Sequence, residues 1–233
     1  MYSFDSRIRY SETDSEGRLT MASLLNYFQD CSIFHSEDLG LGVGYLKERH
    51  LAWVLSSWQI VVERYALLGE KVKIATAPYE FKGFLGYRNF AMCSEDGSFL
   101  AKGNSLWSLL NTDTWKPAIP PQEMLEGYQP EPRLPMDYAS RKIALPESTQ
   151  AQKPIVVKKH HLDTNHHVNN GQYVMIAMEY LPESYRIRQM RAEYKKQAFL
   201  EDVLYPFVGL REGKYVIILR DAEERIYAVV EFM

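Results

Sequence analysis

Apolar and polar residues alternate through much of the first half of the chain, and this pattern predicts antiparallel strands. The alternation runs through 53–62 (WVLSSWQIVV), 72–79 and 87–92. It has the period expected when successive strand side chains point to opposite faces. Ser94-Glu95-Asp96-Gly97 has the composition of a turn between two such strands. We therefore expect one antiparallel sheet in this half.

A helical period replaces the alternation between Thr20 and Leu39. Five apolar residues recur there at the spacing of one helix face: Met21, Leu24, Leu25, Phe28 and Cys31. Thr20 is suited to cap the N-terminus of this helix, and Gly40 is suited to stop it. The sequence thus predicts a helix ahead of the strands.

The same order of elements returns after a proline-rich stretch at 112–154, where eight prolines interrupt any ladder or helix. Beyond it we expect a strand over 156–163, a helix over 171–181, and strands at 188–198, 203–210, 215–219 and 226–232. The predicted domains are an N-terminal unit at 1–115, a linker at 116–154 and a C-terminal unit at 155–233.

Two short internal matches support a duplication. Asp14-Ser-Glu-Gly-Arg-Leu aligns with Asp163-Thr-Asn-His-His-Val, and Leu68-Gly-Glu-Lys-Val aligns with Leu200-Glu-Asp-Val if a gap is allowed. Each helix has to bury an apolar stripe and each sheet an apolar face. Two helices, each wrapped by an antiparallel sheet, satisfy both requirements, so the expected fold class is α+β.

Composition narrows the class of protein. A chain of 233 residues with 46% hydrophobic residues can bury a sizeable core, which excludes intrinsic disorder. A net charge of -3 gives no global reason to expect a nucleic-acid partner. No apolar run reaches the ~20 residues of a membrane span. The two cysteines form no CxxC pair, and the N-terminus lacks a signal-peptide pattern. We therefore expect a cytoplasmic protein.

Candidate chemistry is concentrated in His160–Tyr173, where four His, one Asp and three Asn occur close together. If a strand runs through Asp163, then Asp163, Asn165 and His167 point to one side. The Asp can take a proton or orient an imidazole, the His can move a proton near neutral pH, and the Asn can donate to an oxygen. A helix starting near Asn170 adds unpaired N–H groups for a developing oxyanion. This set is suited to attack on a carbonyl.

Two other interpretations of the cluster are considered. The four histidines could supply zinc ligands, but adjacent His residues point to opposite faces and no distant Cys/His set completes a tetrahedron, so we expect no metal. Alternatively the Asp and Asn residues cap the helix and the histidines lie in a turn. The pattern alone leaves that alternative open.

LDTNHHVNNGQY resembles the D-x-N-x-H-V-N-N-x-x-Y motif of the acyl-ACP thioesterases of plant plastids and bacteria. Shorter segments resemble that family in the same order along the chain: 8–14, 53–55, 62–65, 69–72, 105–107 and 192–196. The resemblance implies a double hot-dog fold, hydrolysis of fatty acyl thioesters of acyl carrier protein, and no cofactor. It also implies that the N-terminal unit binds the acyl chain and that the C-terminal unit carries the catalytic motif, with catalytic roles for Asp163, Asn165 and His167.

One departure from the family affects the expected mechanism. The family places an acid followed by a cysteine where this chain has Gln197 and Ala198. Ala198 cannot act as a nucleophile, so we expect direct attack by water. Gln197 cannot remove a proton, although its amide can orient the water, and we keep it among the catalytic candidates. The base is then Asp163, helped by His167, or another acid such as Glu201.

Expected substrate contacts come from both halves of the chain. Met21, Leu24 and Trp53 are apolar residues that could line a slot for a fatty chain, and ordinary core packing explains them equally well. Asn169 and Asn170 at the start of the second helix are further substrate-binding candidates. Basic residues over 186–196, among them Arg188, suit an acidic carrier protein, or form a solvated strand face.

Alternatives to the leading function also stay open. One is an acyl-CoA thioesterase on the same fold, and another is a non-hydrolytic relative that binds acyl thioesters, suggested by Gln197. A further homodimer is open too, because one chain already supplies two hot-dog units.

Overall fold

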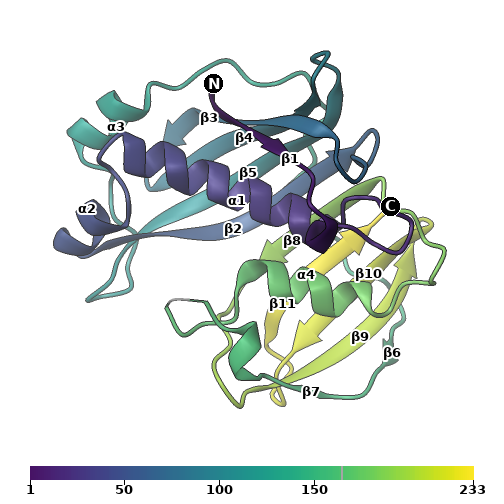
Figure 1. The fold of residues 1–233 in the computed structure, drawn as a ribbon. Helices are drawn as coiled ribbons and strands as arrows, with labels where there is room; N and C mark the ends of the chain where they lie inside the picture. The colour runs from purple at the N-terminus through teal and green to yellow at the C-terminus, as the bar shows by residue number, and fades with distance from the viewer. Residues whose placement is uncertain (164) are drawn as a thin grey trace. The chain divides into compact units, whose positions relative to one another are not determined.

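Two units make up the chain, and each contains antiparallel strands together with at least one helix. The computed structural model describes residues 1–163 and 165–233. Unit 1 comprises Met1–Ser56 and Ile60–Tyr138, and unit 2 comprises Ser57–Gln59 and Ala139–Met233 (Figure 1). The predicted limits of the linker, 116 and 154, stay a prediction.

Unit 1 is built on a sheet with the strand order β1-β3-β4-β5-β2. Its strands are β1 (Tyr2–Arg7), β2 (Leu51–Val62), β3 (Lys71–Lys82), β4 (Leu85–Ser94) and β5 (Phe99–Asn111). The β1/β3, β3/β4 and β4/β5 pairs are antiparallel. The predicted turn at 94–97 is confirmed: Gly97 has a φ of 85° and donates its N–H to the Ser94 carbonyl.

Helix α1 (Met21–Asp38) confirms the predicted early helix and supplies much of the core of unit 1. Thr20 caps it as expected, because its Oγ1 accepts the Ser23 N–H at 3.2 Å. The fully buried Phe28 packs on Phe90 of β4, with ring centroids 5.3 Å apart. Gly103 of β5 lets the ring approach, since a Cβ there would lie 3.1 Å from it.

Two shorter helices of unit 1 frame a separate apolar cluster. They are α2 (Val43–Glu48) and α3 (Gln122–Tyr128). The cluster consists of Leu41, Leu109, Met124 and Tyr128, with partly buried residues such as Trp53 and Phe81 packed against it.

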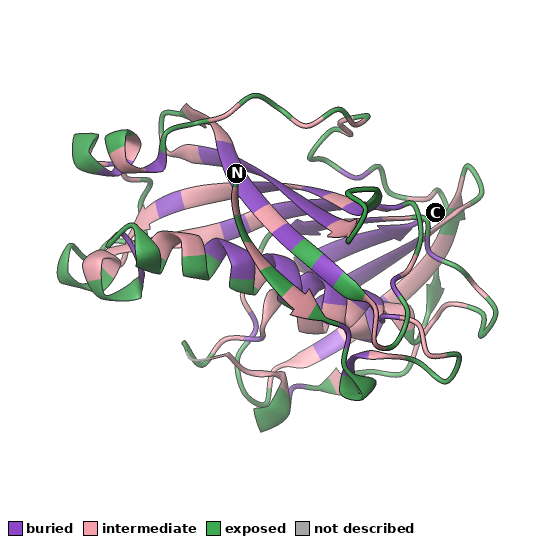
Figure 2. Ribbon diagram, turned by 45° about the horizontal axis from the view of Figure 1, so that its top comes forward, coloured by how far each residue is buried: buried purple, intermediate pink, exposed green. Residues whose placement is uncertain are grey.

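Unit 2 repeats the scheme with a shorter helix, α4 (Asn170–Met178). Its strands are β6 (Gln150–Ala151), β7 (Ile155–Val156), β8 (Gln189–Tyr194), β9 (Val203–Arg211), β10 (Lys214–Arg220) and β11 (Ile226–Phe232). Their order is β8-β11-β10-β9-β6, and β7 also pairs with β9. Buried residues follow the strands of both units (Figure 2).

The structure corrects two local predictions. The strand predicted over 156–163 is wrong: β7 ends at Val156 and a 3₁₀ helix, η2 (Lys159–His161), follows. The proline-rich stretch was predicted to hold no helix, yet α3 lies in it. Pro121 directly precedes α3, and a proline at a helix start removes no hydrogen bond.

Candidate active site

A closed loop, rather than a strand, gathers the predicted catalytic residues of the motif. Leu162 and Val168 pair as an isolated antiparallel bridge, and the Asp163 N–H donates to the His167 carbonyl at 2.8 Å. The Asp163 Oδ1 accepts the N–H groups of Asn165 at 2.8 Å and His167 at 3.2 Å. The expected strand alternation is therefore wrong, because the chain reverses within these residues.

His166 enables the reversal by taking a left-handed φ of 62°. The Asp163 carboxylate stabilises the resulting turn by accepting hydrogen bonds from the backbone N–H groups of Asn165 and His167, as Asp side chains commonly do in turns. Asp163 and His167 are half-buried, and Asn165 is exposed. Thr164 of this motif lies outside the described residues.

The same loop occurs in unit 1, which supports the internal alignment. Thr13 and Leu19 form the bridge there, after the 3₁₀ helix η1 (Tyr10–Glu12). The Asp14 Oδ1 accepts the N–H groups of Glu16 and Arg18, both at 2.9 Å. Gly17, with a φ of 73°, stands where unit 2 has His166. Both units thus share the shape of the loop. Only the loop of unit 2 carries an amide side chain, Asn165, and an imidazole, His167, at the equivalent positions.

The second internal match needs no gap. The Leu67 N–H donates to Glu70 at 2.8 Å, and the Phe199 N–H donates to Asp202 at 2.9 Å. The residue before each acid has a positive φ, 80° at Gly69 and 69° at Glu201. The strands that follow keep the same alignment, because Lys71 and Val72 pair with β1 as Val203 and Leu204 pair with β7. Residues 67–72 therefore align with 199–204, and the expected gap is wrong.

The start of α4 lies next to the loop in the chain. The Asn169 Oδ1 accepts the Gly171 N–H at 2.8 Å, so Asn169 caps the helix. The carbonyl of Asn170 accepts the Tyr194 hydroxyl at 3.0 Å. These bonds fix the helix N-terminus directly after His167 and Val168. That helix end carries a positive dipole charge.

The segment that contains Gln197 is hydrogen-bonded to the loop, although it is far from it in sequence. The Val168 N–H donates to the Ala198 carbonyl at 2.9 Å, and the Ala198 N–H donates to the Tyr173 hydroxyl at 2.9 Å. Ala198 is thus held from both sides, and Gln197 directly precedes it. The structure therefore brings the half-buried Gln197 beside the loop.

Tyr173 is a positioning residue that the sequence analysis did not select, although it ends the motif. Its side chain is buried, and burial raises its pKa above the usual value, with smaller contributions from carboxylates including Asp202 and Asp163. The phenol therefore stays neutral at ordinary pH. It can hold the Ala198 backbone without carrying charge into the core.

The histidines of the cluster have different surroundings. His161 Nδ1 accepts the Lys158 N–H at 3.0 Å, so a neutral ring carries its proton on Nε2. Burial, above all, lowers the pKa of His161, and the adjacent His160 and Lys158 lower it further. The His167 ring meets Phe199 edge to face, with centroids 4.9 Å apart. Within the described residues, no group of three His, Cys, Asp or Glu side chains could hold a metal ion.

Three cations of the basic segment are paired within unit 2. Arg191 lies 2.8 Å from Glu231, and Lys196 lies 2.7 Å from Asp221. Lys195 lies 3.6 Å from Glu193. The positive charge that remains for binding an acidic carrier protein is therefore smaller than the number of basic residues in the sequence indicates. Arg188 is exposed, and its carrier-binding role stays a prediction.

The apolar substrate-binding candidates lie in unit 1. Met21 and Leu24 are buried at 2% and 1% exposure on α1, a depth typical of core residues. Trp53 is half-buried beside Phe81, with ring centroids 6.2 Å apart.

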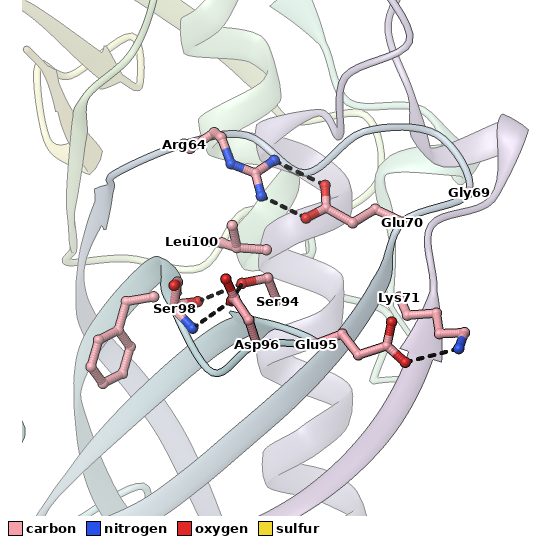
Figure 3. Close-up of a pocket in the computed structure, with 10 residues that line it drawn as sticks. Arg64, Gly69, Glu70, Lys71, Ser94, Glu95, Asp96, Ser98 and Leu100 are labelled. Atoms are coloured by element: carbon pink, nitrogen blue, oxygen red, sulfur yellow. Dashed lines mark hydrogen bonds and ion pairs between the residues drawn. The ribbon is translucent and has the colours of Figure 1, made fainter.

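Two further features of unit 1 bear on the choice of site. A hollow of about 680 Å³ is lined by charged groups that pair with each other, such as Arg64 with Glu70 (Figure 3). None of the predicted catalytic residues lines it. Cys31 and Cys93 are unpaired, and burial raises the pKa of each thiol, to about 12 for Cys31. Neither is suited to act as a thiolate nucleophile.

Comparison with protein families gives two adjacent matches. The acyl-ACP thioesterase N-terminal domain matches residues 1–128, and the acyl-ACP thioesterase C-terminal domain matches residues 145–215. A palmitoyl-acyl carrier protein thioesterase of Gossypium hirsutum is 28% identical over 88% of this chain and 54% of its own length. A dodecanoyl-[acyl-carrier-protein] hydrolase of Cinnamomum camphora is 25% identical over 88% and 58%. The chain spans a little over half the length of these curated relatives.

Solved structures show the same fold over almost the whole chain. An acyl-ACP thioesterase from Bacteroides thetaiotaomicron has a TM-score of 0.90 at 24% identity, covering 99% of this chain and 96% of its own. The 12:0-ACP thioesterase from Umbellularia californica has a TM-score of 0.87 at 21% identity, covering 100% and 96%. The expected double hot-dog fold is confirmed. Among the residues that the structure describes, no helix is long and apolar enough to cross a membrane.

Proposed function

Because the chain belongs to the acyl-ACP thioesterase family, we propose that it hydrolyses fatty acyl thioesters of acyl carrier protein to free fatty acid and carrier. The observation that carries this proposal is the match of both family domains, in order, over most of the chain. The second domain match includes the loop with Asp163, Asn165 and His167.

In the proposed mechanism Asp163 is the general base. Its Oδ1 is occupied by two backbone N–H groups, while Oδ2 has no hydrogen-bond partner among the described residues. Oδ2 takes a proton from water as the water oxygen bonds to the thioester carbon. The negative charge then develops on the former carbonyl oxygen. Asn165 and the N-terminus of α4 donate hydrogen bonds to that oxygen.

Collapse of this intermediate breaks the carbon–sulfur bond and releases the carrier thiolate. His167 protonates the thiolate or orients the attacking water, since an imidazole can exchange a proton near neutral pH. Gln197 has the role of orienting water through its amide, because it cannot remove a proton. Ala198 excludes a cysteine nucleophile at its position, which favours direct attack by water.

The carrier and the compartment belong to the same proposal. Acyl carrier protein is favoured over coenzyme A because the curated relatives are named for that carrier. Arg188 is the proposed contact with the acidic carrier. The two unpaired cysteines suit a reducing compartment, and we propose the cytoplasm. The plant relatives, by contrast, are named as chloroplast proteins.

Release of thiol from purified protein tests the proposal. Acyl-ACP and acyl-CoA of several chain lengths are compared side by side, and faster turnover of acyl-ACP is expected. Faster turnover of acyl-CoA would support the alternative carrier. No thiol release from any substrate, with acyl thioester still bound, would support a non-hydrolytic binding protein and overturn hydrolysis.

A further inference from the structure

A large aromatic side chain at the surface of unit 2 contacts one of the proposed catalytic residues. Phe199 is 49% exposed, and its ring meets the ring of the half-buried His167 edge to face, with centroids 4.9 Å apart. Single apolar residues are common on protein surfaces, so exposure alone does not mark Phe199 as functional. Its contact with an imidazole that is proposed to exchange a proton does.

Backbone hydrogen bonds fix the position of Phe199 relative to the loop. The Phe199 N–H donates to Asp202 Oδ2 at 2.9 Å. The preceding residue, Ala198, is buried, and its carbonyl accepts the Val168 N–H at 2.9 Å. Because Val168 directly follows His167 in the chain, these bonds join the two segments that carry the rings. The contact between the rings is therefore built into the backbone of unit 2.

Unit 1 has the same backbone arrangement with different side chains. The Leu19 N–H donates to the Ala66 carbonyl at 2.8 Å, which is the equivalent of the bond that joins the two segments in unit 2. The residue after Ala66 is Leu67, 50% exposed, and the residue before Leu19 is Arg18. Arg18 and Leu67 pair as an isolated bridge. The turn thus forms without an aromatic ring, and at these positions only unit 2 combines a phenyl group with an imidazole.

A ring held against His167 restricts the orientations that the imidazole can take. The His side chain turns about two bonds, and proton transfer requires one ring nitrogen to face the reacting group. Phe has no hydrogen-bonding group in its side chain, so it supports the imidazole without competing for the exchanged proton. A contact of this kind affects the geometry of the reaction and not the binding of substrate.

We propose that Phe199 is a positioning residue, which holds the His167 imidazole in the orientation needed to protonate the leaving thiolate or to orient water. This role rests on the proposed hydrolysis, and it adds a residue outside the motif that contains Asp163 and His167. Phe199 acts through His167 and not through the substrate. Its removal should therefore lower kcat and leave KM nearly unchanged.

Three variants test the role by thiol release from the fastest substrate in a series of acyl-ACP and acyl-CoA thioesters. Phe199→Ala is expected to lower kcat about three- to tenfold, the factor that corresponds to one edge-to-face ring contact, with KM within about twofold. Leu67→Ala is the matched control, because it truncates the exposed residue of the same turn in unit 1, and both constants should stay unchanged. Phe199→Tyr keeps the ring and should recover most of the lost kcat.

Nuclear magnetic resonance tests the contact in the absence of substrate. The π-electrons of the Phe199 ring displace the resonances of the His167 ring protons, which are assigned by comparison with His167→Gln. Phe199→Ala is expected to shift these resonances, and Leu67→Ala to leave them in place. Resonances that do not move in Phe199→Ala would overturn the contact, whatever the activity of the variant.

The kinetic outcomes separate this role from the proposed hydrolysis. Thiol release by the unaltered protein together with an undiminished kcat in Phe199→Ala would overturn the positioning role alone. A raised KM at unchanged kcat would assign Phe199 to substrate binding and overturn the role as well, as would an equal loss of kcat in Leu67→Ala. The absence of thiol release from the unaltered protein would overturn the proposed hydrolysis, and the positioning role with it.

Discussion

The two aspartate loops provide a matched test of the proposed general base. Asp163 and Asp14 each accept two backbone N–H groups on one carboxylate oxygen, at 2.8 and 3.2 Å in unit 2 and at 2.9 and 2.9 Å in unit 1. Asparagine keeps one side-chain oxygen for these bonds and removes the charge. Asp163→Asn and Asp14→Asn are therefore equivalent changes to the two loops.

The expected effects on stability and on turnover differ in size. Two hydrogen bonds that lose their charged acceptor weaken by roughly 1 kcal/mol each, so each variant should lose about 1–2 kcal/mol of unfolding free energy. Loss of a general base slows turnover by about 10²- to 10⁴-fold, which corresponds to roughly 3–5 kcal/mol of transition-state stabilisation. Only Asp163→Asn should show the second effect.

Thiol release from an acyl thioester measures turnover, and urea denaturation measures stability for the same samples. We expect Asp14→Asn to stay within about threefold of the unaltered protein, as expected for a change that alters only loop stability. Turnover that falls equally in both variants would show that loop geometry, and not the carboxylate at 163, controls the rate. Full turnover in Asp163→Asn would refute its role as the base.

Three further predictions follow from the contacts. Gln197→Glu places a carboxylate beside the loop, and kcat should rise several-fold if the absent acid limits the native chain; an unchanged or lower kcat would count against that. Tyr173→Phe leaves the buried Ala198 N–H unpaired, so urea denaturation should show a loss of about 1–3 kcal/mol together with a lower kcat. Unaltered stability would contradict this contact. Burial lowers the pKa of His35 to about 4, so near pH 5 the unfolded chain binds a proton that the folded chain excludes. Unfolding free energy should therefore fall from pH 7 towards pH 4, by on the order of 1–2 kcal/mol after allowance for partial exposure. His35→Gln should remove that part of the slope, and an identical pH profile would exclude His35 as its source.

The local geometry expected for the catalytic candidates is wrong, while their catalytic roles stay a prediction. Strand alternation was expected to align Asp163, Asn165 and His167, whereas a turn with a left-handed residue at His166 gathers them. Glycine is the residue that most clearly indicates a positive φ, and histidine adopts one far less often, so His166 was only a weak sign of the turn. The equivalent loop in unit 1 has Gly17, from which the geometry could have been inferred.

Short patterns in the sequence determined those helices, strands and turns that are stabilised mainly by residues close together in the chain. The period of apolar residues and the Thr20 cap predicted α1, and alternation with turn residues predicted β2, β3, β4 and the 94–97 turn. The order of elements, repeated after the prolines, predicted two similar units. These features depend on neighbours a few residues apart, which is why the sequence alone carries them.

Tertiary structure alone decided the contacts between distant residues. Ala198 reaches Val168 and Tyr173 only through the fold of unit 2, and this brings Gln197 beside the loop. Arg88 meets His35, 53 positions away, only because α1 packs against the unit 1 sheet. No periodicity encodes such pairings, because they arise from burying a helix stripe on a sheet face and not from the preference of any short segment.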